Sequence, residues 1–155
     1  MASEHRGPDV VAPPPLLYAA PLVGGLLLDR LLPLPSLPRG LTRPLGLAAL
    51  AGGLTLTGWA VSTMARAGTP IDVREAPTRL VTGGPFQHSR NPVYIGLAAI
   101  YTGIALLTRA RWPLLFLPGV LATIDRGVIE REERFLRRGF GEEYGRYLRR
   151  VRRWL

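Results

Sequence analysis

The sequence of 155 residues contains no cysteine and only two histidines, His5 and His88. The absence of cysteine excludes disulfides, thiol catalysis and cysteine-ligated metals, and two histidines alone do not complete a zinc site. Lysine is absent as well, so all 20 basic residues are arginines, which we attribute to the codon bias of a GC-rich genome. We therefore expect no metal ion in this protein.

The basic charge is unevenly distributed. The formal net charge is +9, and half of the arginines lie in the last 30 residues, directly after an apolar stretch. A nucleic-acid-binding protein would need a soluble basic face and a recognisable binding module. Arginines beside an apolar stretch are instead typical of a juxtamembrane segment that is attracted to anionic lipid head groups. The expected partner is therefore a lipid bilayer and not a nucleic acid.

Four apolar stretches predict helices that cross a membrane. Residues 10–28 and 44–65 contain no charge over 19 and 22 residues, and each is long enough to span the bilayer core. Two shorter runs flank a turn marked by Arg109 and Arg111. No segment shows the alternation of a β-strand. We therefore predict an all-α integral membrane protein, a single membrane domain of about four transmembrane helices (10–28, 44–65, 92–107 and 112–128) with a C-terminal amphipathic helical segment.

The distribution of arginine also predicts the orientation. Four spans would place both termini, the loop 66–91 and the tail 129–155 on one side. Together with Arg126, at the adjoining end of the fourth span, that side would carry fifteen of the twenty arginines. The positive-inside rule assigns that side to the cytoplasm, and we expect a bacterial inner membrane. A cleaved signal peptide is the alternative for the first stretch. Such a peptide requires a basic start, whereas here Glu4 and Asp9 offset the charge of Arg6. Residues 1–9 are expected to be disordered.

The segment 82–96 is the first candidate for a binding site. Its glycines and Pro85 permit a tight backbone path along which amide groups can approach a ligand. Asn91 and Pro92 form a helix-start signal, with Asn91 as the cap and Pro92 at the first helical position. The amides of an exposed helix start favour a carboxylate or a phosphate. The structural alternative is a capped junction in which Arg90 reaches the lipid head groups.

A pair of carboxylates in the tail is the second candidate. On a helix, Glu132 and Glu133 lie on or beside an apolar stripe that contains Ile129, Leu136 and Phe140. A carboxylate on a membrane-facing side is unfavourable without a partner. That partner is expected to be either an arginine of the chain or a cationic ligand.

Aromatic residues continue farther along the tail. Tyr144 and Tyr147 belong to a second apolar stripe, which we expect along the membrane interface with Trp154 as an anchor. The Gly-Phe-Gly sequence at 139–141 follows no predicted strand, so it is not a dinucleotide-binding fingerprint. A soluble cofactor domain of the Rossmann type is therefore not expected.

Together, these segments resemble the isoprenylcysteine carboxyl methyltransferase family, which belongs with the membrane phospholipid methyltransferases. Motif order, motif spacing and the intervening pair of apolar runs agree over about residues 66–150. Asn91 stands where many members have histidine, so this position cannot act as a general base that titrates near neutral pH. The resemblance is carried by Thr82-Gly83-Gly84-Pro85-Phe86, Arg90-Asn91-Pro92, Tyr94, Gly96, Arg131-Glu132-Glu133, Leu136, Phe140-Gly141, Tyr144 and Tyr147.

The resemblance implies an S-adenosylmethionine-dependent methyltransferase that acts by direct methyl transfer at the cytoplasmic membrane face. It implies a hydrophobic or lipid-like acceptor, such as a prenylcysteine-type carboxylate, a phospholipid amine or a prenyl lipid. Arg90 and Glu132 are the implied catalytic residues, Arg90 for a carboxylate and Glu132 (or Glu133) for the cationic groups of the cofactor. The implied cofactor-binding residues are Leu80, Val81, Gly84, Pro85, Phe86, Asn91, Pro92, Tyr94, Gly96, Glu132, Glu133, Tyr144 and Tyr147.

Two other functions are compatible with the sequence. One is a non-enzymatic membrane scaffold of the same fold, and the other is a membrane reductase that uses NADPH. Ligand binding discriminates among the three functions, because the methyltransferase binds S-adenosylmethionine, the reductase binds NADPH and the scaffold binds neither.

Overall fold

The computed structural model describes residues 7–155, and this part of the chain is helical without any β-strand. The expected all-α fold is thereby confirmed. Residues 1–6 of the segment expected to be disordered lie outside the described residues, whereas the Gly7 amide donates a hydrogen bond to the Arg74 carbonyl. The elements are α1 (Pro14–Leu31), α2 (Arg39–Arg66), the 3-10 helix η1 (Gly84–Gln87), α3 (Pro92–Thr108), α4 (Arg111–Ile124), the π-helical turn η2 (Asp125–Ile129) and α5 (Glu130–Arg150).

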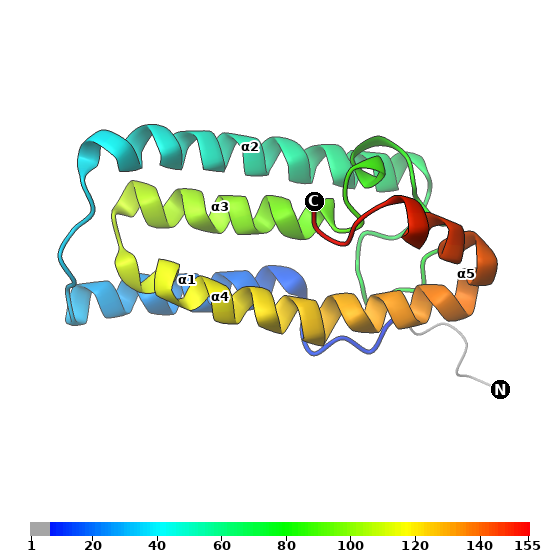
Figure 1. Ribbon diagram of the computed structural model, residues 1–155. Helices are drawn as coiled ribbons and strands as arrows, with labels where there is room; N and C mark the ends of the chain where they lie inside the picture. Colours follow the sequence, from blue (N-terminus) through cyan, green and yellow to red (C-terminus); the bar gives the residue numbers. More distant parts are fainter. Residues whose placement is uncertain (1–6) are drawn as a thin grey trace.

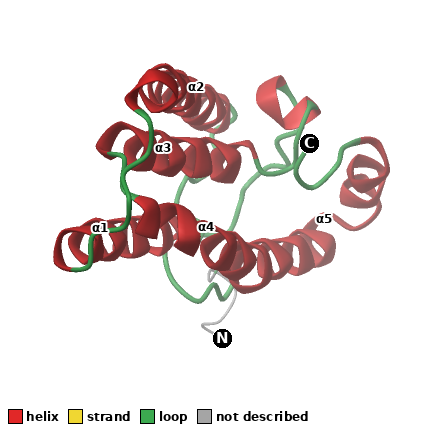
Figure 2. Cartoon of the chain, turned by 60° about the vertical axis from the view of Figure 1, so that its left-hand side comes forward, coloured by secondary structure: helices red, strands yellow, loops and turns green. Residues whose placement is uncertain are grey.

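The bundle consists of two helix pairs, α2 with α3 and α1 with α4, and α3 also contacts the second pair (Figures 1 and 2). Tyr18 of α1 and Tyr101 of α3, which are 4 % and 1 % exposed, meet edge to face with ring centroids 6.4 Å apart. The Tyr18 hydroxyl donates to the Tyr94 carbonyl at 3.0 Å, and that of Tyr101 donates to the Pro113 carbonyl at 2.7 Å. These bonds satisfy the polar ends of rings that otherwise fill the core.

Glycines allow α2 and α3 to approach closely. A Cβ atom at Gly53 of α2 would lie 2.6 Å from the carbonyl oxygen of Gly96 on α3. A Cβ atom at Gly103 of α3 would lie 2.7 Å from the backbone nitrogen of Leu50 on α2. Small residues are the usual means of close helix packing in a membrane, where lipid removes most of the hydrophobic force between helices. The contact holds α2 against the bundle through α3.

The fourth apolar run continues into the charged tail as one helix. After a tight turn at Arg109, where φ is 57°, α4 begins and runs through η2 into α5. Turns of the π type are frequent at functional sites. The long helix breaks at Gly141, whose φ of 48° and ψ of −120° favour glycine. The second half of α5 therefore turns back over the end of the bundle (Figure 1).

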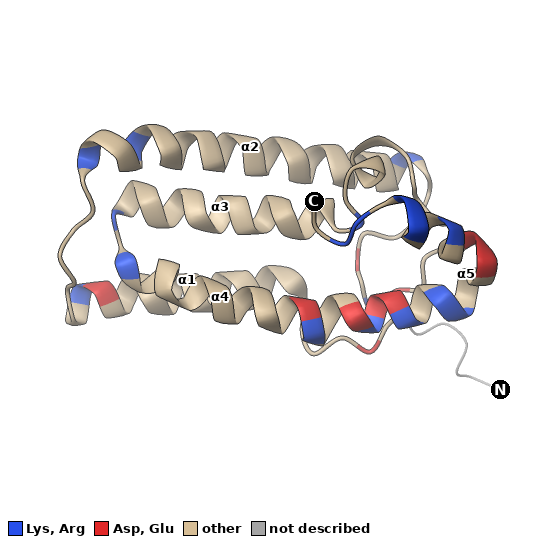
Figure 3. Cartoon of the chain, viewed as in Figure 1, with Lys and Arg blue, Asp and Glu red and all other residues tan. Residues whose placement is uncertain are grey.

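Two helices are long and apolar enough to cross a membrane, α2 and the continuous helix Arg111–Arg150, and α3 is apolar but shorter. The prediction of four membrane spans is thus supported only in part, and a crossing by α1 stays a prediction. Charged residues gather at the two ends of the bundle and leave the middle of the helices uncharged (Figure 3). Most of them lie at the end where α5 turns back.

We predict that Gly103→Ala lowers the free energy of unfolding by about 1–3 kcal/mol, because the added methyl group forces α2 and α3 apart. Gly52→Ala is the matched control, since a Cβ atom there has no neighbour within 4 Å. It is expected to leave stability unchanged or to raise it slightly. Unfolding of the detergent-solubilised protein measures both variants, and equal effects would contradict the role of the α2–α3 contact.

Candidate functional site

A cavity of about 540 Å³ lies at the end of the bundle where α5 turns back. Its walls come from the start of α1, the last turns of α2, the loop 69–81, the first turns of α3 and both halves of α5. Most of the lining is apolar. The volume is typical of pockets that bind small molecules.

The cavity brings together the two segments that the sequence marks as candidate sites. They are far apart in the chain and meet in its wall, where Tyr94 contacts Glu132 and Arg90 contacts Glu133. Eleven of the fourteen residues implied for cofactor binding or for catalysis line it: Leu80, Val81, Phe86, Arg90, Asn91, Pro92, Tyr94, Glu132, Glu133, Tyr144 and Tyr147.

The glycines and the proline of the first segment lie outside the lining, at Gly84, Pro85 and Gly96. Gly84 has a positive φ of 59°, and a Cβ atom there would lie 3.0 Å from Thr63 Oγ1 of α2. Gly96 faces the side chain of Thr57 so closely that a Cβ atom would collide with its hydroxyl. The structure therefore places these residues in the packing of the loop and of α3 against α2.

Asn91 occupies the N-cap position of α3 and Pro92 the first helical position, but the Asn91 side chain does not cap the helix. Its Nδ2 group instead donates to the Arg153 carbonyl at 2.9 Å. The expected side-chain cap is therefore wrong. The physical reason is that the end of the chain passes beside α3 and offers a buried carbonyl group, which needs a donor.

Glu132 is a carboxylate without a cationic partner. Its Oε1 accepts a hydrogen bond from the Tyr94 hydroxyl at 2.8 Å, and among residues 7–155 it forms no ion pair. Burial raises the pKa of Glu132 to about 7; the neighbouring charge of Glu133 adds to this rise and the Tyr94 hydrogen bond opposes it. A carboxyl group whose pKa lies near neutral pH thus faces the cavity.

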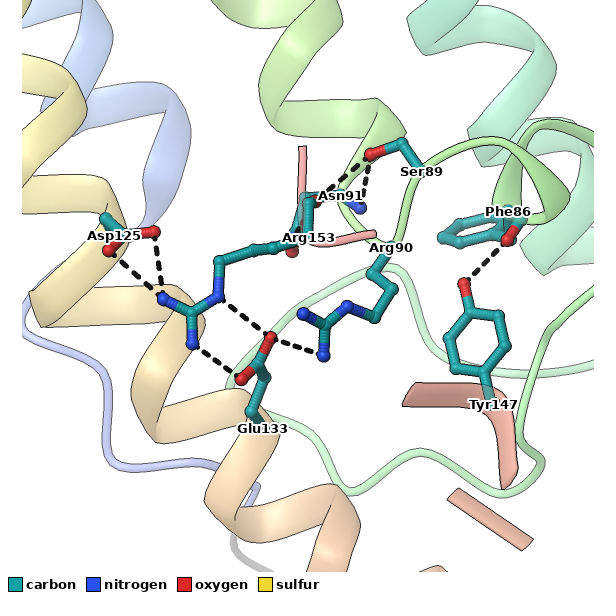
Figure 4. A network of polar contacts seen from close by, with 8 residues as sticks. All are labelled: Phe86, Ser89, Arg90, Asn91, Asp125, Glu133, Tyr147 and Arg153. Atoms are coloured by element: carbon teal, nitrogen blue, oxygen red, sulfur yellow. Dashed lines mark hydrogen bonds and ion pairs between the residues drawn. The ribbon is translucent and has the colours of Figure 1, made fainter. Parts of the chain in front are cut away.

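Glu133 has the opposite environment, because two arginines neutralise it (Figure 4). Arg90 Nη1 lies 3.1 Å from its Oε1, while Arg153 binds both oxygens through Nε at 3.1 Å and Nη2 at 2.8 Å. Arg153 also contacts Asp125 at 3.2 Å. Sequence reasoning missed Arg153, because no helical spacing relates it to Glu133 across the break at Gly141. It missed Asp125 with it, because Asp125 is connected to Glu133 through Arg153.

Tyr144 and Tyr147 point into the protein, with exposures of 2 % and 8 %. The Tyr147 hydroxyl donates to the Phe86 carbonyl at 2.7 Å, and burial raises the pKa of Tyr144 to about 12. The turn at Gly141 thus directs this stripe toward the protein interior, and its expected place along the membrane interface stays a prediction. Trp154, expected as an interfacial anchor, packs against the core.

Comparison with models of known protein families identifies the family of the chain. The model of a family described as phospholipid methyltransferase matches residues 41–143. The chain belongs to this family. The match runs from α2 to the first part of α5, so the membrane methyltransferase family suggested by the motifs is confirmed. No curated protein and no solved structure matches the chain.

The phospholipid methyltransferase match includes most of the cavity wall, among it Arg90, Tyr94 and both glutamates. Tyr144, Tyr147 and Arg153 lie beyond the matched residues. In the part of the chain from residue 7 onward, no three His, Asp or Glu side chains are grouped so that they could hold a metal. The polar side chains that line this cavity are carboxylates, arginines, tyrosines, threonines and Asn91.

We predict opposite effects of the two glutamates on stability. Glu133→Gln is expected to lower the free energy of unfolding by about 3 kcal/mol, because Arg90 and Arg153 would face a neutral amide. Glu132→Gln is expected to leave stability unchanged or raise it at pH 8, because it removes an enclosed carboxylate that lacks a counter-charge. Unfolding in detergent at pH 8 measures both.

The pH dependence provides the control. The raised pKa of Glu132 means that the folded protein holds its proton more tightly than the unfolded chain does. Its contribution to wild-type stability is therefore present below the ordinary carboxyl range of about 4–5, and it is lost as the pH rises to about 7. Glu132→Gln should lose less stability over this window, and an unchanged profile would contradict the environment described for Glu132.

Proposed function

We propose that this protein transfers a methyl group from S-adenosylmethionine to a hydrophobic or lipid-like acceptor at the cytoplasmic face of a membrane. One observation carries the proposal: an apolar cavity, in a member of the phospholipid methyltransferase family, encloses the unpaired carboxylate of Glu132.

The charged side chains of the cavity suit a ligand that carries both a positively and a negatively charged group. A cation that enters the cavity would stabilise the ionised form of Glu132. S-adenosylmethionine carries a sulfonium and an ammonium group, either of which could fill this role. Arg90 has a buried Nε without a hydrogen-bond partner. A carboxylate of the cofactor or of the acceptor would satisfy that donor.

When bound, S-adenosylmethionine supplies an electrophilic methyl group, so that a lone pair of the acceptor forms the new bond while the carbon–sulfur bond breaks and its electrons stay on sulfur. The residues of the chain would contribute orientation through Glu132 and Arg90, with Tyr94 fixing the Glu132 carboxylate. The apolar walls would exclude water. Low polarity favours transfer to an anionic acceptor, because opposite charges then neutralise each other in the transition state.

The apolar part of the lining supports a hydrophobic acceptor. It includes Val61 and Met64 of α2 together with Val93 and Leu97 of α3. Because both helices belong to the apolar bundle, an acceptor chain could enter from the bilayer side. A prenylcysteine-type carboxylate, a phospholipid amine and a prenyl lipid all have the required apolar part.

The distribution of arginine supports the location. The end of the bundle that holds the cavity also holds most of the charged residues (Figure 3). With four spans it would carry fifteen of the twenty arginines, and the positive-inside rule then assigns the loop 66–91 and the tail to the cytoplasm. A bacterial inner membrane is the membrane that we propose.

We predict that Glu132→Gln weakens the binding of S-adenosylmethionine at least tenfold, because the cavity loses its unpaired negative charge. Glu143→Gln removes the same charge from an exposed position of α5 and should change the dissociation constant less than twofold. Calorimetry of the full chain in detergent measures both. Wild-type affinity should also rise between pH 6 and pH 8, as Glu132 loses its proton, and Glu132→Gln should abolish that rise.

Three outcomes would contradict the proposal. If Glu132→Gln bound S-adenosylmethionine as tightly as the wild-type protein, the assignment of Glu132 would be wrong. Displacement of the bound cofactor by NADPH would favour the reductase. Failure of the wild-type protein to bind either compound would favour the non-enzymatic scaffold.

A further inference from the structure

The chain returns to the start of α3 after α5 ends at Arg150. Its backbone is extended at Val151, with φ of −121° and ψ of 132°. The Arg90 amide donates to the carbonyl of Arg152 at 3.0 Å. The carbonyl of Arg153 accepts from Ser89 Oγ at 3.2 Å and from Asn91 Nδ2 at 2.9 Å. Residues 152 and 153 are thus bonded, through their backbone, to the wall of the cavity that carries Arg90.

The side chain of Arg153 reaches the adjoining part of the wall, which α5 forms. Its guanidinium binds both oxygens of Glu133 and also lies 3.2 Å from Asp125 in η2 (Figure 4). A planar guanidinium can hold a carboxylate through two parallel bonds, which fixes orientation as well as distance. One residue therefore connects the start of α3 with the helix that carries Glu132 and Glu133.

The environment makes this connection strong. The side chains of Glu133 and Arg153 are 10 % and 30 % exposed, so solvent screens their attraction less than it would at the surface. Next to them, Trp154 packs against the hydrophobic core and holds the end of the chain in place. Arg153 itself does not line the cavity. It acts on the cavity only through the residues that it holds.

We propose that Arg153 is a positioning residue of the cofactor site, which sets the separation of the α3 start and α5 and thereby the affinity for cofactor. This inference rests on the proposed function. It concerns a residue beyond the region that matches the family. Arg153, together with Arg90, keeps Glu133 neutralised within the cavity wall, which leaves Glu132 as the carboxylate that a cationic ligand meets.

Binding of S-adenosylhomocysteine to the full chain in detergent tests the proposal by calorimetry. Arg153→Gln is expected to weaken binding at least tenfold. Arg153→Lys keeps the charge but cannot grip both Glu133 oxygens and Asp125, so it should recover part of the lost affinity. Arg150→Gln is the control, because Arg150 is an exposed residue of the same helix end. Its affinity should stay within twofold of wild type.

Hydrogen exchange, read by mass spectrometry, separates positioning from general destabilisation. In Arg153→Gln, amide exchange should increase in residues 86–94 and in the first half of α5, while α2 keeps its wild-type protection. Wild-type affinity in Arg153→Gln, or a uniform increase of exchange over the whole chain, would overturn the proposal. If the wild-type protein bound no S-adenosylhomocysteine, the proposed function would fail, and the exchange pattern would still decide whether Arg153 joins the two walls.

Discussion

The ion pairs of Glu133 are the interaction on which the end of this bundle depends. Arg90 comes from the loop before α3 and Arg153 from the end of the chain, and both meet the one carboxylate at 3.1 Å or less. A buried charge is unfavourable alone and becomes tolerable only when its partners are in place. Each of the three segments therefore depends on the other two for its charge partners, and two of them, the start of α3 and α5, form part of the cavity wall.

This arrangement gives two adjacent carboxylates different properties. Glu133 forms ion pairs with two arginines, whereas Glu132 accepts only a hydrogen bond from the Tyr94 hydroxyl. Burial raises the pKa of Glu132 to about 7. Neighbouring acids whose environments differ in this way commonly have separate tasks. Glu133 holds the wall together, and Glu132 is free to meet a ligand. The proposed cation of the cofactor would supply the charge that the protein itself does not place beside Glu132.

Part of this site could be predicted from the sequence, because it depends on local signals. Pro92 marks a helix start, the pair Glu132 and Glu133 stands out on an apolar helix face, and the order of motifs indicates the family. The rest of the site depends on the reversal of the chain at Gly141, and no periodic pattern of residues in the sequence indicates such a reversal. That return brings Arg153 beside Glu133 and takes the Asn91 side chain away from its expected capping role.

One part of α3 packs closely against α2, and another part borders the cavity. Gly103, in the C-terminal half of α3, allows α2 to approach closely, whereas the N-terminal turns of α3 border the cavity of about 540 Å³.

The most direct measurement is a crystal structure of the full chain, grown from lipid, with S-adenosylhomocysteine. The ligand is predicted between the segment 80–94 and α5, with its ammonium group or its sulfur facing Glu132. A cavity filled only by lipid, with the ligand bound elsewhere or absent, would contradict the proposed function.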